Sequence, residues 1–262
     1  MFSSRAWRLI ENGIGSAARN MAVDETLLYG FGQNDRPVLR LYEWKPSLSF
    51  GRFQAPHELI DLEKAEAAGI ACVRRMTGGG IMAHGGDLSY ALVVPRTMLE
   101  GRGVRENYRL LCAFLIRLYD RLGLEAAFVR DKGHPQSASP VCAAGSEAYD
   151  VVIGGRKVGG NAQRYARGVL FQHGSIPLTS DAASFDAFLK TEAALGDAAT
   201  LEALGAAFET KTVRTHLKEA FCEAFATELE PVPLHADETR RAEALMTRKY
   251  SQEAWNRDAR RS

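Results

Sequence analysis

The sequence predicts an α+β fold in which helices pack on a mixed β-sheet. Two observations predict it. Before residue 181, apolar stretches with the spacing of strands alternate with stretches that have the spacing of helices, and from about residue 181 to residue 262 a helical pattern prevails. The 262 residues suffice for one large domain or two small ones. Because no internal repeat or long low-complexity linker divides them, we expect a single domain over residues 1–262.

The elements expected in the first half follow from local periodicity. Strands are expected over residues 5–12, 37–44, 46–53, 70–76 and 87–94, the last of which alternates and then becomes wholly apolar. Helices are expected over residues 16–31, 59–69 and 106–123. Met21, Leu27 and Leu28 lie near one face of the first helix, and Gly69 and Gly123 end the other two.

The second half begins with a segment that has no periodicity. Residues 131–148, DKGHPQSASPVCAAGSEA, are rich in Gly, Pro and Ser and are expected to form a long loop, and such loops are often functional. Residues 149–163 predict two short strands joined at Gly154 and Gly155, which is the pattern of a β-hairpin. Residues 168–178 predict a further strand, which precedes the helical C-terminal part.

Composition and charge exclude several classes of function. Hydrophobic residues make up 46% of the chain and charged residues 25%, as in ordinary globular proteins. The net charge of +1 gives no general electrostatic reason to bind nucleic acid or an anionic membrane, although a local basic site remains open. No apolar run approaches about 20 residues, and the N-terminus lacks the apolar core of a signal peptide. We therefore expect no membrane association and a cytoplasmic location.

Cysteine and histidine spacing argues against a metal site. The four cysteines, Cys72, Cys112, Cys142 and Cys222, are widely separated and form no CxxC pair. A structural zinc site or a disulfide framework is therefore not expected. Because the histidines and acidic residues also lack the spacing of metal ligands, we predict no catalytic metal.

Three consecutive glycines, Gly78 to Gly80, follow two arginines within residues 73–95, VRRMTGGGIMAHGGDLSYALVVP. Such glycines cost backbone entropy, but they permit positive φ, let a substrate lie against the backbone, and expose N–H groups that hold an anion or an oxyanion. Arg74 and Arg75 alternate along the preceding strand, so only one of them can face such a site. A tight turn between two strands is the alternative. Neither GK[ST] nor GxGxxG is present, so the usual phosphate cradles are excluded.

Four stretches resemble the biotin/lipoate protein ligase and octanoyltransferase superfamily. They are RRMTGGGIMAHGGDLSY, similar to its signature; RNMAVDETLL, similar to its first helix; GGRKVGGNAQRYARGVLFQHGSIPL, similar to its lysine-bearing hairpin and the next strand; and RKYSQEAWN, similar to the segment that closes its catalytic domain. They cover most of the chain in the family's order. The resemblance implies a catalytic domain like those of biotin ligases and class II aminoacyl-tRNA synthetases, with a mixed sheet around an acyl-binding tunnel.

The superfamily contains two chemistries. Ligases activate lipoate with ATP and Mg²⁺ and pass it through lipoyl-AMP to a lysine of a carrier domain. Transferases move octanoate from acyl carrier protein through a cysteine thioester and require no cofactor. Only Gly85 and Gly86 separate His84 from DLSY, as in the cysteine-dependent octanoyltransferases, whereas the ligases usually have one more residue there. The segments TGGG and GNAQ look more like those of the ligases.

A cysteine and the chain length also bear on the choice. Cys142 lies seven residues before Tyr149 in the stretch CAAGSEAYD. This stretch resembles CFAAPSWYE of the transferases, in which the cysteine is the nucleophile. The resemblance implies a nucleophilic Cys142, although a lone loop cysteine is more often inert. Trp255 and Asn256 lie near the chain end. Many lipoate ligases continue from this point into an accessory domain, and we expect no accessory domain in this chain. The alternatives are an octanoyl or lipoyl transferase and a lipoate-protein ligase that works with a separate accessory subunit.

The resemblance implies a second catalytic group and a set of pocket residues. Lys157, in GRKVGGNAQ, matches the family lysine that contacts the acyl carbonyl or acyl phosphate; taken alone, it would be a solvated hairpin lysine. A cation of this kind favours a thiolate and polarises a carbonyl. The other expected site residues bind the substrate. They are Arg75, Thr77, Gly78, Gly79, Gly80, His84, Asn161 and Gln163.

Individual roles are assigned to some of these residues. Arg75 is expected to contact the carrier protein or its pantetheine phosphate. His84 either positions the thioester or acts as an acid or base, or it makes a structural hydrogen bond between strands. Asn161 and Gln163 are expected to line the pocket, and His173 is expected to pack against the glycine run.

The resemblance also implies the partners. Acyl carrier protein is the expected donor, and the expected acceptor is a glycine cleavage H protein or an E2 lipoyl domain. A third hypothesis is a non-catalytic module that binds an acyl group or a carrier domain without turnover, and the retained Lys157 argues against it.

Overall fold

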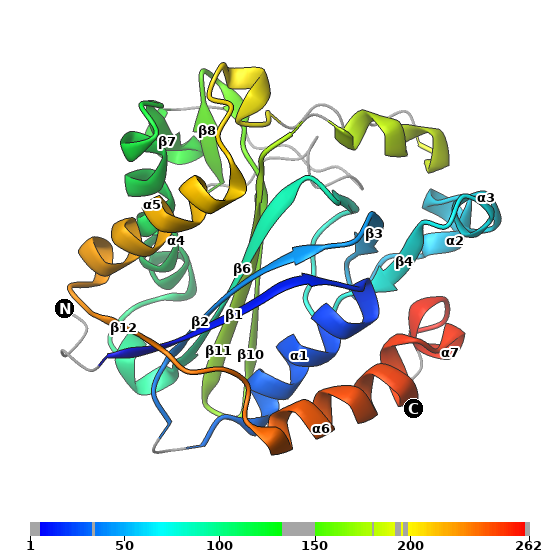
Figure 1. Cartoon of the computed structure of the whole chain (residues 1–262), viewed down its shortest axis with the longest axis horizontal. Helices are drawn as coiled ribbons and strands as arrows, with labels where there is room; N and C mark the ends of the chain where they lie inside the picture. Colours follow the sequence, from blue (N-terminus) through cyan, green and yellow to red (C-terminus); the bar gives the residue numbers. More distant parts are fainter. Residues whose placement is uncertain are drawn as a thin grey trace.

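A six-stranded mixed sheet forms the centre of the fold (Figure 1). The computed structural model describes residues 6–32, 35–132, 150–179, 181–191, 195 and 199–259. The strand order is β10-β11-β6-β2-β1-β12. The strands are β1 (Trp7–Gly15), β2 (Val38–Trp44), β6 (Asp87–Pro95), β10 (Gly160–Ala166), β11 (Val169–Pro177) and β12 (Leu229–Pro231). β1 pairs in parallel with β2 and β12 and the other pairs are antiparallel, so the expected mixed sheet is confirmed.

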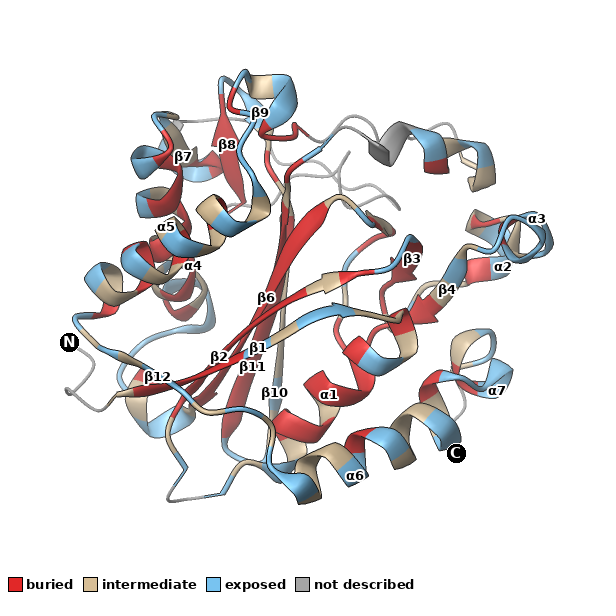
Figure 2. Cartoon of the chain, in the orientation of Figure 1, coloured by how far each residue is buried: buried red, intermediate tan, exposed pale blue. Residues whose placement is uncertain are grey.

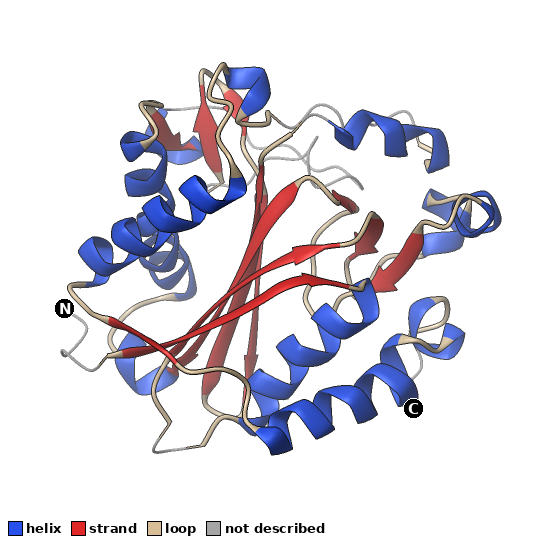
Figure 3. Ribbon diagram, in the orientation of Figure 1, coloured by secondary structure: helices blue, strands red, loops and turns tan. Residues whose placement is uncertain are grey.

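Helices cover both faces of the central sheet (Figure 3). α4 (Val104–Arg121) and α5 (Thr210–Phe225) pack with each other and against one face. α1 (Ala17–Gly30) and α6 (Ala236–Leu245) cover the other face. The helices expected from the sequence at the positions of α1 and α4 are thus confirmed, and the expected α+β class with them.

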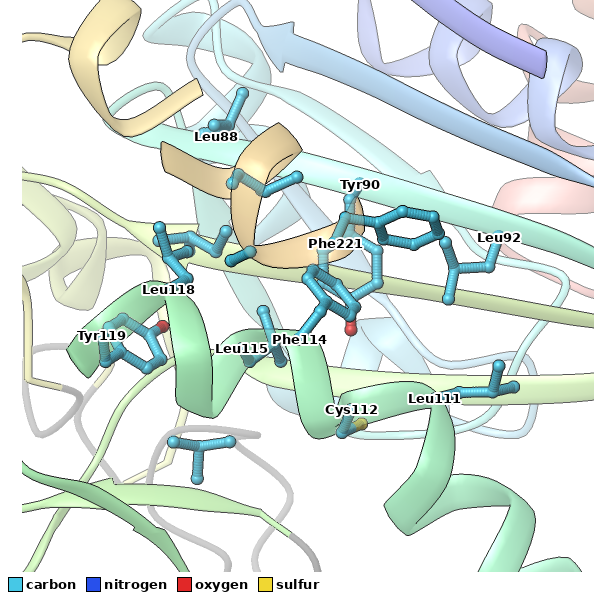
Figure 4. Close-up of a cluster of buried hydrophobic side chains, with 14 of the residues drawn as sticks. Leu88, Tyr90, Leu92, Leu111, Cys112, Phe114, Leu115, Leu118, Tyr119 and Phe221 are labelled. Carbon is cyan, nitrogen blue, oxygen red and sulfur yellow. The ribbon is translucent and has the colours of Figure 1, made fainter. Parts of the chain in front are cut away.

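The strands at the centre of the sheet are buried on both faces (Figure 2). Because side chains alternate along a strand, Tyr90 and Leu92 of β6 join the core under α4 and α5, and Val93 joins the core under α1. Figure 4 shows Tyr90 and Leu92 beside Phe114 of α4 and Phe221 of α5. The rings of Tyr90 and Phe114 meet edge to face, with centroids 5.0 Å apart. Each such buried side chain stabilises the fold by roughly 1.5–3 kcal/mol.

Two smaller sheets flank the central one. β3 (Ser47–Phe50) pairs in parallel with β4 (Ala71–Arg74) and antiparallel with β5 (Met82–His84), and the loop between β4 and β5 carries the three glycines. The third sheet has the order β7-β8-β9. It consists of β7 (Ala126–Phe128), β8 (Val151–Ile153) and β9 (Arg156–Lys157). β8 and β9 form the hairpin expected at Gly154 and Gly155.

Short helices complete the fold. The α-helices are α2 (Pro56–Leu59), α3 (Leu62–Ala67) and α7 (Glu253–Asn256), and a π-helix, η6, spans Met246–Tyr250. The 3-10 helices are η1 (Arg96–Leu99), η2 (Val129–Lys132), η3 (Asp181–Phe188) and η5 (Glu202–Leu204). Over the ranges that the structure describes, every helix is too short or too polar to cross a membrane.

Three strands differ from the expectation. The sequence predicts no strand at β5 or β7, and β12 lies within the part expected to be helical. Each is three residues long, which is too short to establish a period-two pattern. β12 also contains Pro231, and its strand conformation depends on parallel pairing with β1 at the sheet edge. The expected segment 149–163 is divided, because β9 ends at Lys157 and a separate strand, β10, begins at Gly160.

Candidate active site

Residues 75–80, here called the glycine loop, lie against the turn that follows β3. The backbone N–H of Arg52 donates to the carbonyl of Thr77 at 2.8 Å. A Cβ atom on Gly51 would lie only 2.0 Å from the carbonyl oxygen of Gly79, and Gly79 itself has a φ of +94°. Two backbone segments therefore touch at a distance that only glycine permits, and one of them needs the left-handed region that favours glycine.

Arg75 organises the glycine loop from inside the protein. Its guanidinium donates to the carbonyl oxygens of Gly78 and Gly80, at 3.1 and 2.8 Å, and to the hydroxyl of Ser49 at 2.8 Å. The residue is 3% exposed. The structure therefore places Arg75 in the wall of the site, where it fixes the loop carbonyls, rather than on the surface that a carrier protein meets.

Arg74 points the other way and fastens the C-terminal segment. Its guanidinium donates to the carbonyls of Trp255, Asn256 and Arg257, and its own carbonyl accepts from the Trp255 indole N–H at 3.0 Å. The expectation that only one of the two arginines faces the glycine loop is confirmed, because successive side chains of a strand point to opposite sides.

A narrow pocket opens between the glycine loop and the central sheet, with about 20 Å³ of space open to the centre of a water molecule. Aromatic, small and polar groups share its wall. They include Tyr42, Trp44, Arg75, Gly79, Met82, His84, Asn161, Ala162 and His173. Of the expected pocket residues, Arg75, Gly79, His84 and Asn161 line this space, while Thr77, Gly78, Gly80 and Gln163 lie outside its wall.

His84 is held on both ring nitrogens and on one ring face. Nδ1 lies 3.0 Å from the Asp87 carboxylate and Nε2 lies 2.7 Å from the Ser49 hydroxyl. The ring stacks on Trp44, with centroids 4.0 Å apart. A carboxylate only accepts hydrogen bonds, so in a neutral His84 the proton is on Nδ1 and Nε2 accepts from Ser49. His84 thus makes hydrogen bonds between strands and also lies in the pocket wall, so both expected roles remain predictions.

These contacts form a continuous hydrogen-bond chain. Asp87 accepts from His84, Ser49 donates to His84 and accepts from Arg75, and Arg75 donates to the carbonyls of the glycine loop. Each member of the chain is buried. Removal of any one of them leaves a buried polar group without a partner, which costs about 1–3 kcal/mol.

Asp87 is the ionised end of that chain. Burial by itself would raise the pKa of this carboxyl. The neighbouring His84 and hydrogen bonds from the Ser175 hydroxyl and the Gly85 amide outweigh burial and hold the pKa of Asp87 below its usual value. Asp87 is therefore a carboxylate at neutral pH and fixes the tautomer of His84.

His173 joins the glycine loop to α1. Its Nε2 lies 2.7 Å from the Thr77 hydroxyl, and its Nδ1 lies 3.2 Å from the Asp24 carboxylate. The expectation that His173 packs against the glycine run is confirmed. Burial lowers the pKa of His173 despite the opposing effect of Asp24, so the ring is neutral at pH 7, donates to Asp24 and accepts from Thr77.

Asn161 and Gln163 lie on the opposite face of β10 from Ala162. The Asn161 amide oxygen accepts from the Tyr90 hydroxyl, and the Gln163 amide donates to Gln172 at 2.7 Å. Residues paired across antiparallel strands share a face, and Gln163 pairs with Gln172 on the α4 side. Gln163 is therefore directed away from the glycine loop, contrary to the expectation that it lines the same pocket.

Lys157 is held by a buried carboxylate. Its Nζ lies 2.7 Å from Asp150, and the side chain is 10% exposed. A solvated hairpin lysine would be far more exposed, so that alternative is wrong. The ion pair fixes the ammonium at the start of the segment that leads into β10. The expected nucleophile, Cys142, lies outside the described residues.

Sequence reasoning missed three members of this site. Ser49, Asp87 and Asp24 are polar residues in segments expected only as strands or a helix, yet all three are buried and contact the histidines. A local signal existed for one of them. Asp87 is a charged residue at the start of a strand that is mostly apolar, and a buried charge of that kind needs a partner.

The comparisons with known proteins agree with this geometry. The sequence profile described as the lipoyl protein ligase A/B catalytic domain matches residues 16–228. A relative from Kyrpidia tusciae named octanoyltransferase LipM is 38% identical over 271 residues, which cover 96% of this chain and 98% of the relative.

Solved structures have the same fold. A lipoate-protein ligase A bound with ATP superposes with a TM-score of 0.83 at 25% identity and covers 97% of this chain and 99% of its own. The bi-partite lipoate protein ligase of Thermoplasma acidophilum, studied with its E2 lipoyl domain, also gives a TM-score of 0.83 at 25% identity, with 98% of both chains covered. The resemblance inferred from four sequence stretches is confirmed. This chain belongs to the lipoyl protein ligase A/B catalytic domain family.

Proposed function

We propose that this protein is an acyltransferase that moves an octanoyl group from acyl carrier protein to a lysine of a lipoyl-accepting domain. The observation that carries the proposal is the 38% identity to an octanoyltransferase LipM, which extends over 96% of this chain and 98% of the relative. The buried ion pair of Lys157 and the pocket beneath the glycine loop support it, because acyl transfer needs a fixed cation and a lined site.

The proposed reaction has two steps, with Cys142 as the nucleophile. In the first, the Cys142 thiolate attacks the carbonyl carbon of the donor thioester, and the carrier thiolate leaves and takes up a proton. In the second, the acceptor lysine amine attacks the new thioester. The Cys142 thiolate then leaves, the nitrogen loses a proton, and an amide results. Both steps use a thioester that is already activated, so the proposed reaction requires neither ATP nor a metal ion.

Lys157 is the proposed positioning cation for both steps. An ammonium near a thiol favours the thiolate, and near a carbonyl it stabilises the negative charge that develops on the oxygen. The buried carboxylate of Asp150, 2.7 Å from Nζ, holds the amine in one place before substrate arrives. Preorganisation of this kind is what makes a charge effective in a transition state.

The pocket wall has the apolar character that an acyl group requires. Tyr42, Trp44, Met82 and the backbone of Gly79 present mainly apolar surface to a narrow space. The open space of about 20 Å³ holds about one water molecule, so the wall must move apart to admit an octanoyl tail. Burial of the tail would then contribute roughly 0.8 kcal/mol per CH₂, or several kcal/mol in all. The two carboxylates beside the pocket, Asp24 and Asp87, are buried and paired with His173 and His84.

The similarity to solved lipoate-protein ligases supports ATP-dependent ligation as a second candidate function. Two lipoate protein ligases, one of them bound with ATP and the other bi-partite, match this fold with TM-scores of 0.83. Such a ligase would form lipoyl-AMP from lipoate and ATP with Mg²⁺, together with a separate accessory subunit. Full-length similarity to octanoyltransferases favours transfer over ligation.

One pair of incubations distinguishes the two functions. The purified protein is mixed with a lipoyl-accepting domain and either octanoyl-acyl carrier protein or lipoate with ATP and Mg²⁺, and the acceptor mass is measured. We expect octanoylation of the acceptor in the first mixture without nucleotide. Modification in the second mixture alone would establish the ligase and overturn the transferase.

A further inference from the structure

The inner end of the acyl pocket is closed by a buried ion pair and the histidine in front of it. Arg40 of β2 and Asp24 of α1 are paired at 2.5 Å, and their side chains are each 1% exposed. His173 of β11 lines the pocket and contacts the Asp24 carboxylate at 3.2 Å. Arg40, Asp24 and His173 are here called the ion-pair layer. The two steps proposed above use none of the three.

Strand register shows where this layer lies along the pocket. On the α1 face of the central sheet, residues that pair across neighbouring strands form rows. The first row contains Asp87 and Pro177, the second contains Tyr42, Ser89, Ser175 and Gly160, and the third contains Arg40, Ala91, His173 and Ala162. Among the described residues, the pocket wall includes members of the second and third rows but none of the next row. That fourth row contains Val38, Val93, Phe171 and Arg164.

The proposed catalytic lysine lies at the other end of these rows. β10 runs from Gly160 in the second row to Ala162 in the third, so the chain before Gly160 leads toward the first row. A Cβ atom on Gly159 would lie 3.4 Å from Pro177 of the first row, which agrees with this direction. Lys157 is two residues further back. An acyl group whose carbonyl is near Lys157 therefore extends its tail along the rows toward the ion-pair layer.

The distance between the two ends suits a chain of about eight carbons. The first and third rows are four residues apart along each strand, which is roughly 13 Å. A carbon–carbon bond is about 1.5 Å long, so the seven bonds of an octanoyl chain span at most about 11 Å. A dodecanoyl chain has eleven such bonds and is more than half as long again. The shorter chain ends before the third row, whereas the longer chain has to enter it.

Hydrogen bonds hold the ion-pair layer in place. The Arg40 guanidinium donates to the Asp24 carboxylate at 2.5 Å and to two oxygens of Asn20, at 3.0 and 2.9 Å. Its Nε donates to the Asn12 amide oxygen at 2.7 Å, and Asp24 accepts from the Tyr42 hydroxyl at 3.1 Å. Separation of a buried ion pair leaves each charge without its partner, which is strongly unfavourable. Parting of the pocket walls therefore widens the space without carrying it past the layer.

We propose that the ion-pair layer is the length stop of the acyl pocket and makes the enzyme select straight acyl chains of about eight carbons over longer ones. The inference rests on the proposed function, because that function places an acyl tail in this pocket. Up to the stop, each buried CH₂ tightens binding by about fourfold. Beyond it, a further CH₂ has to displace a paired charge, so binding weakens instead. Arg40, Asp24 and His173 are thus specificity residues and take no part in the chemical steps.

Three variants test the length stop. His173→Ala removes the member of the layer that lines the pocket. The double substitution Arg40→Ala and Asp24→Ala removes the ion pair behind it. Ala162→Leu fills the third row from β10 and leaves the ion-pair layer intact, so it shortens the pocket instead of lengthening it.

The matched control is the double substitution Arg8→Ala and Glu238→Ala, which removes another ion pair, at 2.7 Å, between a strand of the central sheet and a helix. Rates are measured with small thioesters of straight six-, eight-, ten- and twelve-carbon acids, at a fixed concentration of the acceptor domain. The readout is the ratio of kcat/KM for the twelve-carbon chain to kcat/KM for the eight-carbon chain, because a general loss of structure leaves this ratio unchanged. Thermal melting verifies that the variants fold, and Ala162→Leu still tests the proposal if the Arg40 and Asp24 double variant does not fold.

We expect the wild-type protein to use the eight-carbon chain at least about tenfold better than the twelve-carbon chain. His173→Ala and the Arg40 and Asp24 double variant raise the ratio by about tenfold or more, and the control leaves it unchanged. Ala162→Leu shifts the preference to the six-carbon chain. A wild-type ratio in both layer variants, or an unshifted preference in Ala162→Leu, overturns the proposal. A loss that is equal for all chain lengths also overturns it, because the layer then serves only the fold.

Equilibrium binding separates this proposal from the proposed function. Isothermal titration calorimetry with octanoate and with dodecanoate measures Kd without turnover. If the wild-type protein transfers no octanoyl group, the function fails, but the length stop is still supported when octanoate binds about tenfold more tightly than dodecanoate and His173→Ala removes that difference. Dodecanoate that binds the wild-type protein as tightly as octanoate, or more tightly, overturns the length stop.

Discussion

The Ser49 hydroxyl oxygen lies 2.7 Å from Nε2 of His84 and 2.8 Å from the guanidinium of Arg75. One small side chain thus joins the histidine of the pocket wall to the arginine that holds the glycine loop. This relationship makes Ser49 the link between β5 and the loop, although nothing in its local sequence distinguishes it from Ser47 two residues earlier.

Ser49→Ala is expected to destabilise the protein by about 1–3 kcal/mol, because two buried groups lose a partner. The glycine loop loses its anchor at the same time, so octanoyl transfer should fall as well. Ser47→Ala is the control, since the Ser47 hydroxyl is equally buried and donates only to the Lys45 carbonyl. Urea denaturation and transfer rates give the comparison. Equal effects of the two substitutions would contradict the hydrogen-bond chain.

Cys142→Ser is expected to abolish the acyl-enzyme species and to lower transfer by at least about 10³-fold, because the nucleophile is lost. Intact-mass spectrometry after incubation with octanoyl-acyl carrier protein detects the acyl-enzyme. Cys72→Ser is the control. Burial raises the pKa of Cys72 to about 11, so this thiol stays protonated at neutral pH and its replacement should leave acylation intact. A full-strength acyl-enzyme signal in Cys142→Ser would remove this cysteine from the mechanism.

Lys157→Ala is expected to lower kcat by about 10²–10³-fold, because a preorganised charge near the reacting carbonyl is lost. Binding of the apolar tail should change little, so KM for the donor stays close to wild type. Arg156→Ala tests the neighbouring cation of β9, which is exposed, whereas Lys157 is paired with Asp150. Single-turnover rates of acylation measure the effect. Wild-type acylation rates in Lys157→Ala would show that the ion pair only stabilises the hairpin and has no part in catalysis.

Gly51→Ala adds only one methyl group but is expected to distort the glycine loop. The new Cβ would lie 2.0 Å from the Gly79 carbonyl, so the glycine loop must move and the pocket wall with it. Gly103→Ala provides the comparison, because a Cβ there meets no atom within 4 Å. We expect a fall in melting temperature and a raised KM for the octanoyl donor only in Gly51→Ala. Similar behaviour of both variants would mean that the loop tolerates displacement.

Stability is expected to fall as the pH drops below about 6.5, in part because of His173. Burial lowers the pKa of His173 in the folded protein, so between the folded and unfolded pKa values the unfolded chain binds more protons. The slope from this group is at most about 1.4 kcal/mol per pH unit. His173→Gln keeps one donor for Asp24 and one acceptor for Thr77 but does not titrate.

Urea denaturation at pH 7.5 and pH 5.5 measures this effect. The wild-type protein should lose more stability on acidification than His173→Gln. His57→Gln, at an exposed position, should behave like the wild type. The same loss in all three proteins would assign the acid sensitivity to groups other than His173.

Much of the fold follows from local pattern. The spacing of apolar residues predicts α1, α4 and the strands β2, β6 and β11, because each is long enough to repeat its period several times. β5, β7 and β12 have only three residues each, and their pairing partners lie elsewhere in the chain. Hydrogen bonds to a distant strand, not local propensity, decide their conformation.

The sequence by itself determined the family, the glycine loop, the two alternating arginines and the lysine of the hairpin, because each is a local pattern of residue types. Only the tertiary structure decided which groups meet. It placed Ser49 between His84 and Arg75, turned Gln163 toward α4, and brought Arg40 and Asp24 together behind His173. These groups come from segments far apart in the chain, and their distances depend on sheet register and helix packing, which no short stretch of sequence records.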